Sequence, residues 1–548
     1  MKNKIERKSL QVFVIVFCVL LLFTLAFNIN NSTGIVVVND DFKTKSLDNL
    51  LSGNAKLLNN FSSYFGGNGA EYRYNIGDLS YTDIERDLDG NIVLVGRTTS
   101  TVFPIVNGFQ SSYNGGASDA FVTKISPDGQ TILFSTFLGG SGEEWATEVA
   151  IDSDNNIVVI GTTASTNFPT QDPLYPTHSG GGEVGSYDIF VSRFNSDGQS
   201  LNYSTFLGGS GDDWGYGIDC DSDDNIIVTG STYSGDFPIL NAHQGSISLQ
   251  VDFYITKLHK DGQSLNFSTF MGAAGNDGGQ SLECDSENNI IAYGITGSGS
   301  FPIVGDVWQS SFGGGYDAAV IKLEPDGDVI FSSFLGGQYD DYPYSMCIDN
   351  NNDILICGKT ISTSFPTTTG SIQTTNAGGY DGFYSRISTQ DIELNCSSYL
   401  GGLYTDAIYD ITCDNTGNIF LVGETDSTDF QLVNPFNSEH ENKLEGFLTI
   451  VNAQGTTTLL STYLTGNEDD RGRNIVVDDS ENIYIAGYTT STNFLTNNAL
   501  QNSLNGSSDM FLMKFSIGLQ ETEVNGFSVY TIMPLCFVVM FFIVRRRK

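Results

Sequence analysis

Short apolar runs recur along most of the chain at nearly even spacing, and turn residues separate them. The clearest run is an element of the type Ser-Thr-Phe-Leu-Gly-Gly, which begins at Ser62, Ser135, Ser204, Ser268, Ser332, Ser397 and Ser461. Consecutive copies lie 64 to 73 residues apart, so seven units extend from residue 62 to about residue 516. Self-similarity at a fixed period is typical of repeat architectures.

Each unit contains three further apolar segments. Two of them flank an Asp/Asn/Gly turn, as in IDSDNNIVVIG (Ile151 to Gly161), which is the pattern of a β-hairpin. The third follows a loop with Phe-Pro, as in DAFVTKISPDG from Asp119. None of the units shows the 3.6-residue period of an amphipathic helix. Each unit is therefore predicted to form four short strands, the content of one propeller blade.

These units resemble the SBBP, or seven-bladed β-propeller, repeat family. The resemblance rests on the STFLGG element, the D-x-x-x-N-I-x-x-x-G hairpin, the T-x-S-x-x-F-P loop and the D-A-F-V-T-K strand, and it covers roughly 450 of the 548 residues. Gln431 and Leu495 depart from it at the Pro position, and in the sixth unit Glu445 and Val451 replace the Asp and the Lys. The resemblance implies a propeller fold and a surface location, but no catalytic activity.

The order of the segments predicts how the ring closes. The seventh unit begins near Asn474 and its third strand is Met510 to Phe515, after which no Gly-Gly strand follows. An unmatched copy of that strand, at residues 60–67, precedes the first inner strand. We therefore predict an all-β, seven-bladed propeller of four-stranded blades over residues 59–517, closed by this N-terminal strand.

The N-terminal end is basic and then apolar. Lys2, Lys4, Arg7 and Lys8 precede the apolar run Leu10 to Phe27. This is the pattern of a secretory signal peptide or an uncleaved signal anchor, which we assign to residues 1–28. Residues 29–58 are interpreted as a linker.

The C-terminal end is apolar and then basic. We interpret residues 518–526 as a short stalk and residues 527–544 as a transmembrane or sorting segment, followed by the basic tail 545–548. A basic cluster directly after an apolar span favours the cytoplasmic side for that cluster, so the propeller is expected outside the cell. The ending also resembles prokaryotic sorting signals, in which an enzyme removes the span and attaches another anchor.

The composition argues against some classes of partner and of cross-link. The 25 Lys and Arg against 64 Asp and Glu give a net charge of −39, which argues against a nucleic-acid partner. Six cysteines lie between the apolar ends, and Cys220, Cys284 and Cys413 each precede an Asp at the same repeat position. Because equivalent positions on separate repeats are poor bonding partners, free thiols are favoured over disulfides.

Acidic pairs follow the Gly-Gly element in four units. They are Glu143 and Glu144, Asp212 and Asp213, Asp340 and Asp341, and Asp469 and Asp470. Loops at this place should emerge on one face near the channel, so the pairs are candidate ligands of calcium in an acidic rim. Alternatively, each acid accepts backbone N–H groups in the crossover between blades. The sequence indicates no other cofactor.

Four Asn-x-Ser/Thr acceptors occupy the same place on the predicted outer strand: Asn60, Asn202, Asn266 and Asn395. They are either glycosylation sites or simply polar positions that face solvent.

Catalytic motifs are not apparent in the sequence. There is no GxSxG, HExxH or Walker motif, and His178, His243, His259 and His440 fall at unrelated repeat positions. We expect an extracellular, membrane-anchored propeller that acts as a non-enzymatic binding, adhesion or surface-structure module. Its expected partner is an extracellular glycan or a surface protein. The alternative is a polysaccharide hydrolase or lyase on a propeller scaffold.

Overall fold

The fold was analysed in a computed structural model, which describes residues 27–29, 36–38, 55–70, 82–180, 186–248 and 250–519. Residues Asn59–Ser516 form one compact unit, and Met1–Leu58 with Ile517–Lys548 form another. In the second unit, strand β1 (Phe27–Ile29) pairs with β2 (Val36–Val38). The predicted signal, linker, stalk, span and tail lie wholly or mostly outside the described residues. Within the described ranges, no helix has the length and apolar character needed to span a bilayer.

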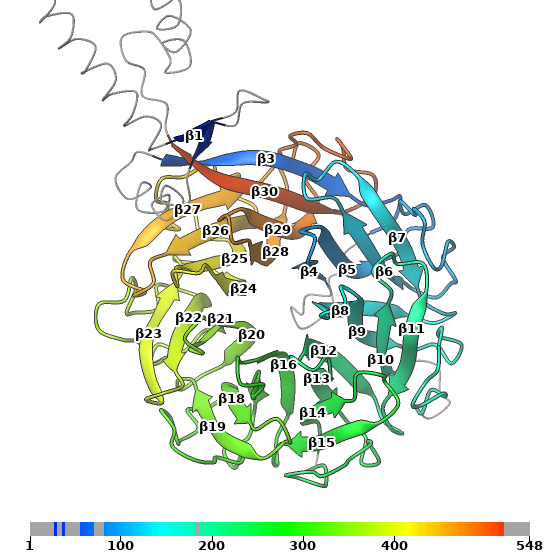
Figure 1. The fold of residues 1–548 in the computed structure, drawn as a ribbon. Coiled ribbons are helices and arrows are strands. Elements are labelled where there is room, and N and C mark those ends of the chain that lie inside the picture. The colour runs from blue at the N-terminus through cyan, green and yellow to red at the C-terminus, as the bar shows by residue number, and fades with distance from the viewer. Residues whose placement is uncertain are drawn as a thin grey trace, which may run out of the picture. The chain divides into compact units, whose positions relative to one another are not determined.

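The larger unit consists of seven four-stranded sheets arranged around an axis, as predicted (Figure 1). In each sheet the chain runs from the innermost strand outwards. The blades, each from inner to outer strand, are β4 (Asp83–Arg86), β5 (Ile92–Thr98), β6 (Asp119–Ile125), β7 (Ile132–Leu138); β8 (Glu144–Ile151), β9 (Ile157–Thr163), β10 (Asp188–Phe194), β11 (Leu201–Leu207); β12 (Asp213–Cys220), β13 (Ile226–Thr232), β14 (Asp252–Leu258), β15 (Leu265–Met271); β16 (Asp277–Cys284), β17 (Ile290–Thr296), β18 (Asp317–Leu323), β19 (Val329–Leu335); β20 (Asp341–Ile348), β21 (Ile354–Thr360), β22 (Asp381–Ser388), β23 (Glu393–Leu400); β24 (Asp406–Cys413), β25 (Ile419–Thr425), β26 (Glu445–Val451), β27 (Thr458–Leu464); and β28 (Asp470–Val477), β29 (Ile483–Thr489), β30 (Asp509–Leu519), β3 (Ala55–Phe65).

The seventh blade takes its outer strand from the N-terminal side of the chain. Strand β3 lies beside β30, which confirms the predicted closure (Figure 1). The Ser62 backbone N–H donates to the Asn497 carbonyl at 2.8 Å. The Tyr64 hydroxyl donates to the Ser491 carbonyl at 2.8 Å and accepts from the Phe494 N–H at 2.9 Å. One tyrosine thus fastens β3 to the loop that precedes β30.

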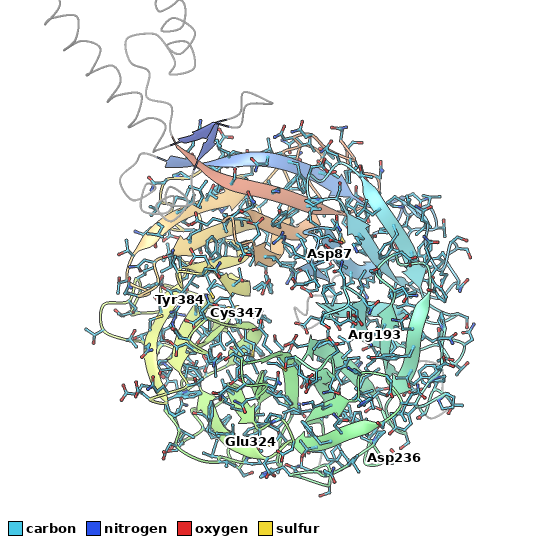
Figure 2. The ribbon with its side chains drawn as sticks, in the orientation of Figure 1. Asp87, Arg193, Asp236, Glu324, Cys347 and Tyr384 are labelled. Atoms are coloured by element: carbon cyan, nitrogen blue, oxygen red, sulfur yellow. The ribbon has the colours of Figure 1, made fainter. Side chains whose placement is uncertain are left out.

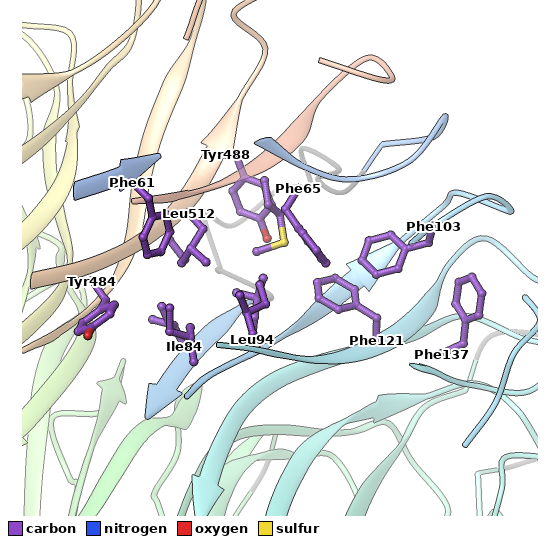
Figure 3. Packing of buried hydrophobic residues seen from close by; sticks show 14 residues of the cluster. Phe61, Phe65, Ile84, Leu94, Phe103, Phe121, Phe137, Tyr484, Tyr488 and Leu512 are labelled. Atoms are coloured by element: carbon purple, nitrogen blue, oxygen red, sulfur yellow. The ribbon is translucent and has the colours of Figure 1, made fainter. Parts of the chain in front are cut away.

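Apolar residues fill the space between neighbouring blades. All seven residues of β5 and all seven of β6 are buried, because both faces of each sheet pack against another sheet. This explains why the strands read as nearly continuous apolar runs instead of alternating ones. Between the seventh and first blades, Phe61, Tyr484 and Leu512 pack in one cluster with Leu94 and Phe121 (Figure 3).

A steric constraint explains why a glycine recurs in the hairpin of each blade. A Cβ at Gly161 would lie 2.1 Å from the Trp145 carbonyl oxygen and 2.5 Å from the Phe190 ring. Any larger residue would force the inner strand away from its partner.

The acidic hairpin turns are Asx turns. Asp152 Oδ1 accepts from the Asp154 and Asn156 N–H groups at 2.9 and 2.8 Å. The basic residue of the third strand pairs with the same kind of Asp, as in Lys124 with Asp87 at 2.5 Å. In the sixth blade this basic position is occupied by Ile450, and not by Val451 as we expected from the sequence. Lys124 and Ile450 correspond because each is the last residue before the bulge of its third strand.

All six cysteines between the apolar ends are free, as predicted. Cys347, Cys357 and Cys396 are buried, and the other three are half-buried. Figure 2 shows Cys347 close to the axis and Tyr384 farther out in the same blade.

Deleting residues 59–67 should abolish the cooperative thermal melt, since it exposes one edge of β30 and opens the ring. Tyr64→Phe should lower stability by about 1–3 kcal/mol, because it leaves the buried Phe494 N–H and Ser491 carbonyl without their partner. Both effects are measured by thermal and denaturant melts.

Tyr404→Phe is the control, since Tyr404 is 59% exposed. An unchanged melt after the deletion would contradict closure through β3.

Candidate functional site

The second acid of each predicted pair does not lie on an exposed rim. Glu144, Asp213, Asp341 and Asp470 are the first residues of their inner strands, and all four are fully buried. The first acids, Glu143, Asp212, Asp340 and Asp469, are half-buried. The expectation of an open rim built from all eight carboxylates was therefore wrong, because the chain turns inwards between the two residues of each pair.

Each buried acid closes the crossover between two blades. Glu144 Oε2 accepts from the Gly140 N–H at 3.0 Å, and Oε1 accepts from the Thr163 hydroxyl at 2.8 Å. Asp341 likewise accepts from the Gly337 N–H at 2.7 Å. This is the alternative that the sequence left open, in which the acids accept backbone N–H groups.

A second buried carboxylate lies next to the first. In the first six blades it is the first residue of the third strand: Asp119, Asp188, Asp252, Asp317, Asp381 and Glu445. Asp509 has the same position in the seventh blade and is also buried. A Cβ at Gly336 would lie 2.6 Å from Asp317 Oδ1 and 2.8 Å from Asp341 Oδ2. The first glycine of the Gly-Gly element therefore leaves room for a carboxyl pair. We call this arrangement the junction pair.

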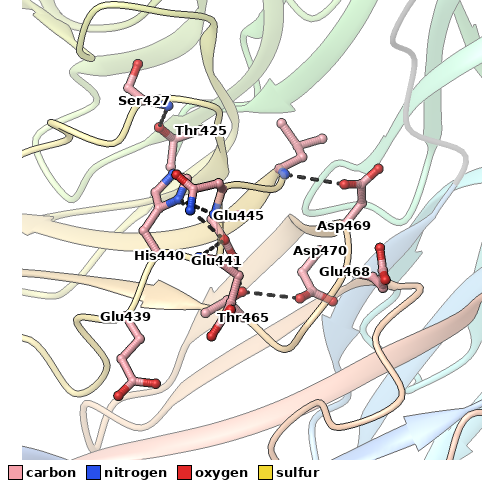
Figure 4. Close-up of polar contacts among 12 residues, drawn as sticks. Thr425, Ser427, Glu439, His440, Glu441, Glu445, Thr465, Glu468, Asp469 and Asp470 are labelled. Carbon is pink, nitrogen blue, oxygen red and sulfur yellow. Dashed lines mark hydrogen bonds and ion pairs between the residues drawn. The ribbon is translucent and has the colours of Figure 1, made fainter.

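The sixth blade has Thr465 where the other blades have this glycine. Its hydroxyl donates to Glu445 and lies 3.4 Å from Asp470 Oδ2, so it bridges the junction pair (Figure 4). In the sixth blade a hydroxyl therefore occupies the space that glycine leaves open beside the pair in the other blades.

The sequence analysis did not identify the side chains that lie beside the acid of the third strand. In five blades this side chain is a glutamine: Gln110, Gln244, Gln309, Gln373 and Gln501. For example, Gln373 Nε2 donates to Asp381 at 2.7 Å. The sequence pattern that could have identified these glutamines is a Gln two residues before a Ser or Thr, in the loop after Phe-Pro.

In each of the other two blades a histidine lies near the acid, three residues after the position that corresponds to the glutamine. His178 Nδ1 lies 3.9 Å from Asp188, and His440 Nδ1 lies 3.7 Å from Glu445. The assignment of His178 and His440 to unrelated repeat positions was therefore wrong. The longer loop of the second unit concealed their equivalence.

Burial favours the protonated form of the acids in a junction pair. Burial, together with the nearby charge of Asp341, raises the pKa of Asp317 to about 7, and burial raises the pKa of Asp341 to about 6. Asp317 Oδ1 is buried and has no hydrogen-bond partner. Because two buried carboxylates cannot both ionise cheaply, we expect about one proton per pair near neutral pH.

A separate small cavity lies on the propeller axis. Its volume is about 90 Å³, and all seven inner blade edges contribute to its lining. Six inner strands bulge there, and the bulged residue lines the cavity: Thr147, Tyr216, Gln280, Tyr344, Tyr409 and Arg473. Thr82 precedes β4 at the corresponding place. Bulges commonly redirect side chains at functional sites.

Three carboxylates line the cavity and also bind the next blade. Asp83 Oδ2 accepts from the Val149 N–H at 3.0 Å, and Asp410 Oδ2 accepts from the Ile475 N–H at 2.7 Å. Glu148 accepts from the Ile218 N–H in the same way. Burial raises the pKa of all three, that of Asp410 to about 6.

Arg473 is the cation of this cavity. Its guanidinium lies 3.6 Å from the centre of the Tyr409 ring, and its side chain is 1% exposed. The Tyr409 hydroxyl donates to Glu424 Oε1 at 2.7 Å. The cavity therefore offers an aromatic, a cationic and an acidic wall within a small volume.

The four predicted glycosylation sites lie on outer strands. Asn60, Asn202 and Asn395 are exposed on β3, β11 and β23, and Asn266 is half-buried on β15. Their placement is compatible with both alternatives, so glycosylation stays a prediction.

Two segments, residues 397–431 and 461–494, match the model of the SBBP family, a beta-propeller repeat. The chain carries SBBP repeats. The segment 397–431 runs from the outer strand β23 through the inner hairpin β24–β25, so one SBBP repeat spans two blades. That offset leaves the last blade without an outer strand from its own end of the chain, and β3 supplies it.

None of the curated proteins matches this chain in sequence. Similar solved structures include a protein of unknown function from Dyadobacter fermentans, with 10% identity, a TM-score of 0.40, and coverage of 85% of this chain and 99% of that one. The WD40 β-propeller domain of Doa1 has 10% identity and a TM-score of 0.42, with coverage of 84% and 97%. A PL25 ulvan lyase has 9% identity and a TM-score of 0.41, with coverage of 79% and 93%. These similarities concern the fold alone.

The free energy of unfolding should fall as pH rises from 5 to 8. The folded pKa values of the junction pairs lie above the unfolded values near 4, so their stabilisation is complete below pH 4 and is lost through pH 6–7. Each extra proton held by the folded state changes stability by about 1.4 kcal/mol per pH unit. Denaturant melts across this pH range measure the slope.

Asp317→Asn should flatten that slope, because an amide can donate to Asp341 without binding a proton. Asp326→Asn, at an exposed position, is the matched control. Equal slopes in the two variants would contradict a titrating pair at this junction.

The two alternatives for the acidic pairs, calcium ligation and acceptance of N–H groups in the crossover, differ in how the protein should respond to calcium. Among the residues that the structure describes, no three His, Cys, Asp or Glu side chains are grouped so as to hold a metal ion. We expect millimolar calcium to leave the melting temperature unchanged within about 1 °C, since the buried acids already accept N–H and hydroxyl hydrogens. A rise that Asp213→Asn abolishes would instead support a metal site.

Proposed function

We propose that this protein is an extracellular, membrane-anchored β-propeller that binds a surface partner without chemical turnover. The observation that carries the proposal is the axial cavity. The bulge residues that line it are of four types, three Tyr with one Thr, one Gln and one Arg, although the scaffold around them is repeated seven times. Such variation at a concave place on a repeating scaffold supports recognition there.

The charge of the protein supports a surface role. A net charge of −39 keeps such domains soluble and mutually repelling. The partner under this proposal is an extracellular glycan or a surface protein, and the C-terminal segment 527–544 holds the propeller at the membrane.

Anchoring is tested by truncation. Removing residues 527–548 should move the protein from the membrane fraction of cells into the medium, and protease added to intact cells should digest the full-length propeller. Replacing Arg545, Arg546, Arg547 and Lys548 with Ala is the control for loss of the basic tail alone. Retention of the truncated protein inside cells would contradict the proposed location.

Binding is tested with the full-length protein on immobilised glycans and on intact cells, with and without calcium. The proposal expects retention without release of product. Failure to bind any glycan, surface protein or cell would overturn it.

The second candidate function is a polysaccharide hydrolase or lyase. The observation in its favour is that Asp83, Glu148 and Asp410, with raised pKa values, line the same cavity. New reducing ends or unsaturated sugars, lost in Asp410→Asn, would favour this enzyme over the binding module.

A further inference from the structure

Six partly exposed aromatic side chains gather on the face of the propeller where the inner strands begin, here called the front face. They occupy three kinds of position at the ends of strands. Tyr187, Tyr316 and Tyr380 directly precede third strands, Trp214 and Tyr342 are second residues of inner strands, and Tyr233 directly follows β13. Since antiparallel neighbours alternate in direction, all three kinds of position lie on the same face. We call these six residues the aromatic arc.

The fold itself does not require aromatic residues there. At the position before the third strand, other blades have Ser118, Leu444 and Ser508. At the second position of the inner strand, the sixth blade has Ala407 and the fourth has Gly278. The aromatic arc is therefore confined to the second to fifth blades and breaks the symmetry of the ring.

One part of the arc is held by ring contacts around a lysine. The Tyr342 ring centre lies 6.0 Å from that of Tyr316 and 6.1 Å from that of Tyr380. Lys359 Nζ lies 5.1 Å from the Tyr380 ring centre and 5.6 Å from that of Tyr342. Lys359 is buried, so these rings are fixed from beneath and keep part of their surface in solvent.

The other part is fixed in a similar way. The Trp214 and Tyr233 ring centres are 5.5 Å apart, and Tyr187 packs on Trp145 at 5.0 Å. The Tyr187 hydroxyl donates to Glu143 Oε2 at 3.2 Å. Tyr233 is 48% exposed, so much of its ring is open to solvent.

We infer that the aromatic arc is the binding surface for an uncharged polysaccharide chain that runs around the mouth of the axial cavity. This inference rests on the proposed function and names the class of its partner. Rigid, half-exposed rings can stack on the apolar faces of sugar rings. The half-buried carboxylates Glu143, Asp212 and Asp340 lie among them as acceptors for sugar hydroxyls. The same carboxylates and the net charge of −39 disfavour sulfated or uronate polymers.

Affinity electrophoresis of the full-length protein in detergent tests the inference. The gels contain a neutral polysaccharide (xylan, a β-glucan or a galactomannan), cationic chitosan or anionic alginate. We expect retardation by at least one neutral polymer, and weakening of about tenfold or more in Trp214→Ala and Tyr342→Ala. Tyr233→Ala, at an exposed position that cannot unfold the blade, should weaken binding too.

Phe109→Ala is the matched control, because Phe109 is 39% exposed but packs on Phe194, outside the arc. It should leave the affinity unchanged. Retardation by charged polymers alone, or equal affinity in the arc variants and the control, would overturn the inference while leaving a binding function in place. Absence of any bound glycan, surface protein or cell overturns both the inference and the proposed function.

Discussion

The whole propeller depends on the pairing of β3 with β30. Without it, the seventh blade would have three strands and the ring two open edges, and unpaired sheet edges recruit other chains. The contacts of β3 join residues that are 430 positions apart, as with Tyr64 and Phe494, so this pairing is expected to form after the other six blades. The domain is therefore expected to gain its stability in a single late step, because such long-range closure is costly in chain entropy.

The junction pairs show how a very acidic chain can bury carboxylates inside a packed ring. Buried carboxylates are expensive unless they are hydrogen-bonded or protonated. Backbone N–H groups and hydroxyls satisfy most of these oxygens, and burial raises the pKa of the acids, which favours their protonated form. The formal charge of −39 is therefore expected to overstate the charge of the folded protein as the pH falls towards 6.

The sequence was sufficient to predict the fold because each blade repeats the same strand and turn chemistry. The offset of the Gly-Gly strand at Ser62 even predicted the closing blade. The site was harder to predict, because the role of an acidic residue depends on whether it is buried, and the sequence does not show this. Glu143 and Glu144 are neighbours in sequence, yet one is half-buried and the other fully buried. The histidines were also misassigned, because the longer loop of the second unit hid the shared repeat position of His178 and His440. The axial cavity could not be predicted at all, because it depends on bulges that have no sequence signature.

The closing blade also decides how the domain responds to mechanical load. Asn60 lies by Ser516, and Gly69 lies by Ser507, so β3 and β30 run in opposite directions. The polypeptide thus enters and leaves the ring at the same corner of one sheet. A force between the two ends would pull these strands apart from that corner, breaking their hydrogen bonds one after another as a zipper opens. Under such a force the closing blade would open gradually, before the other six.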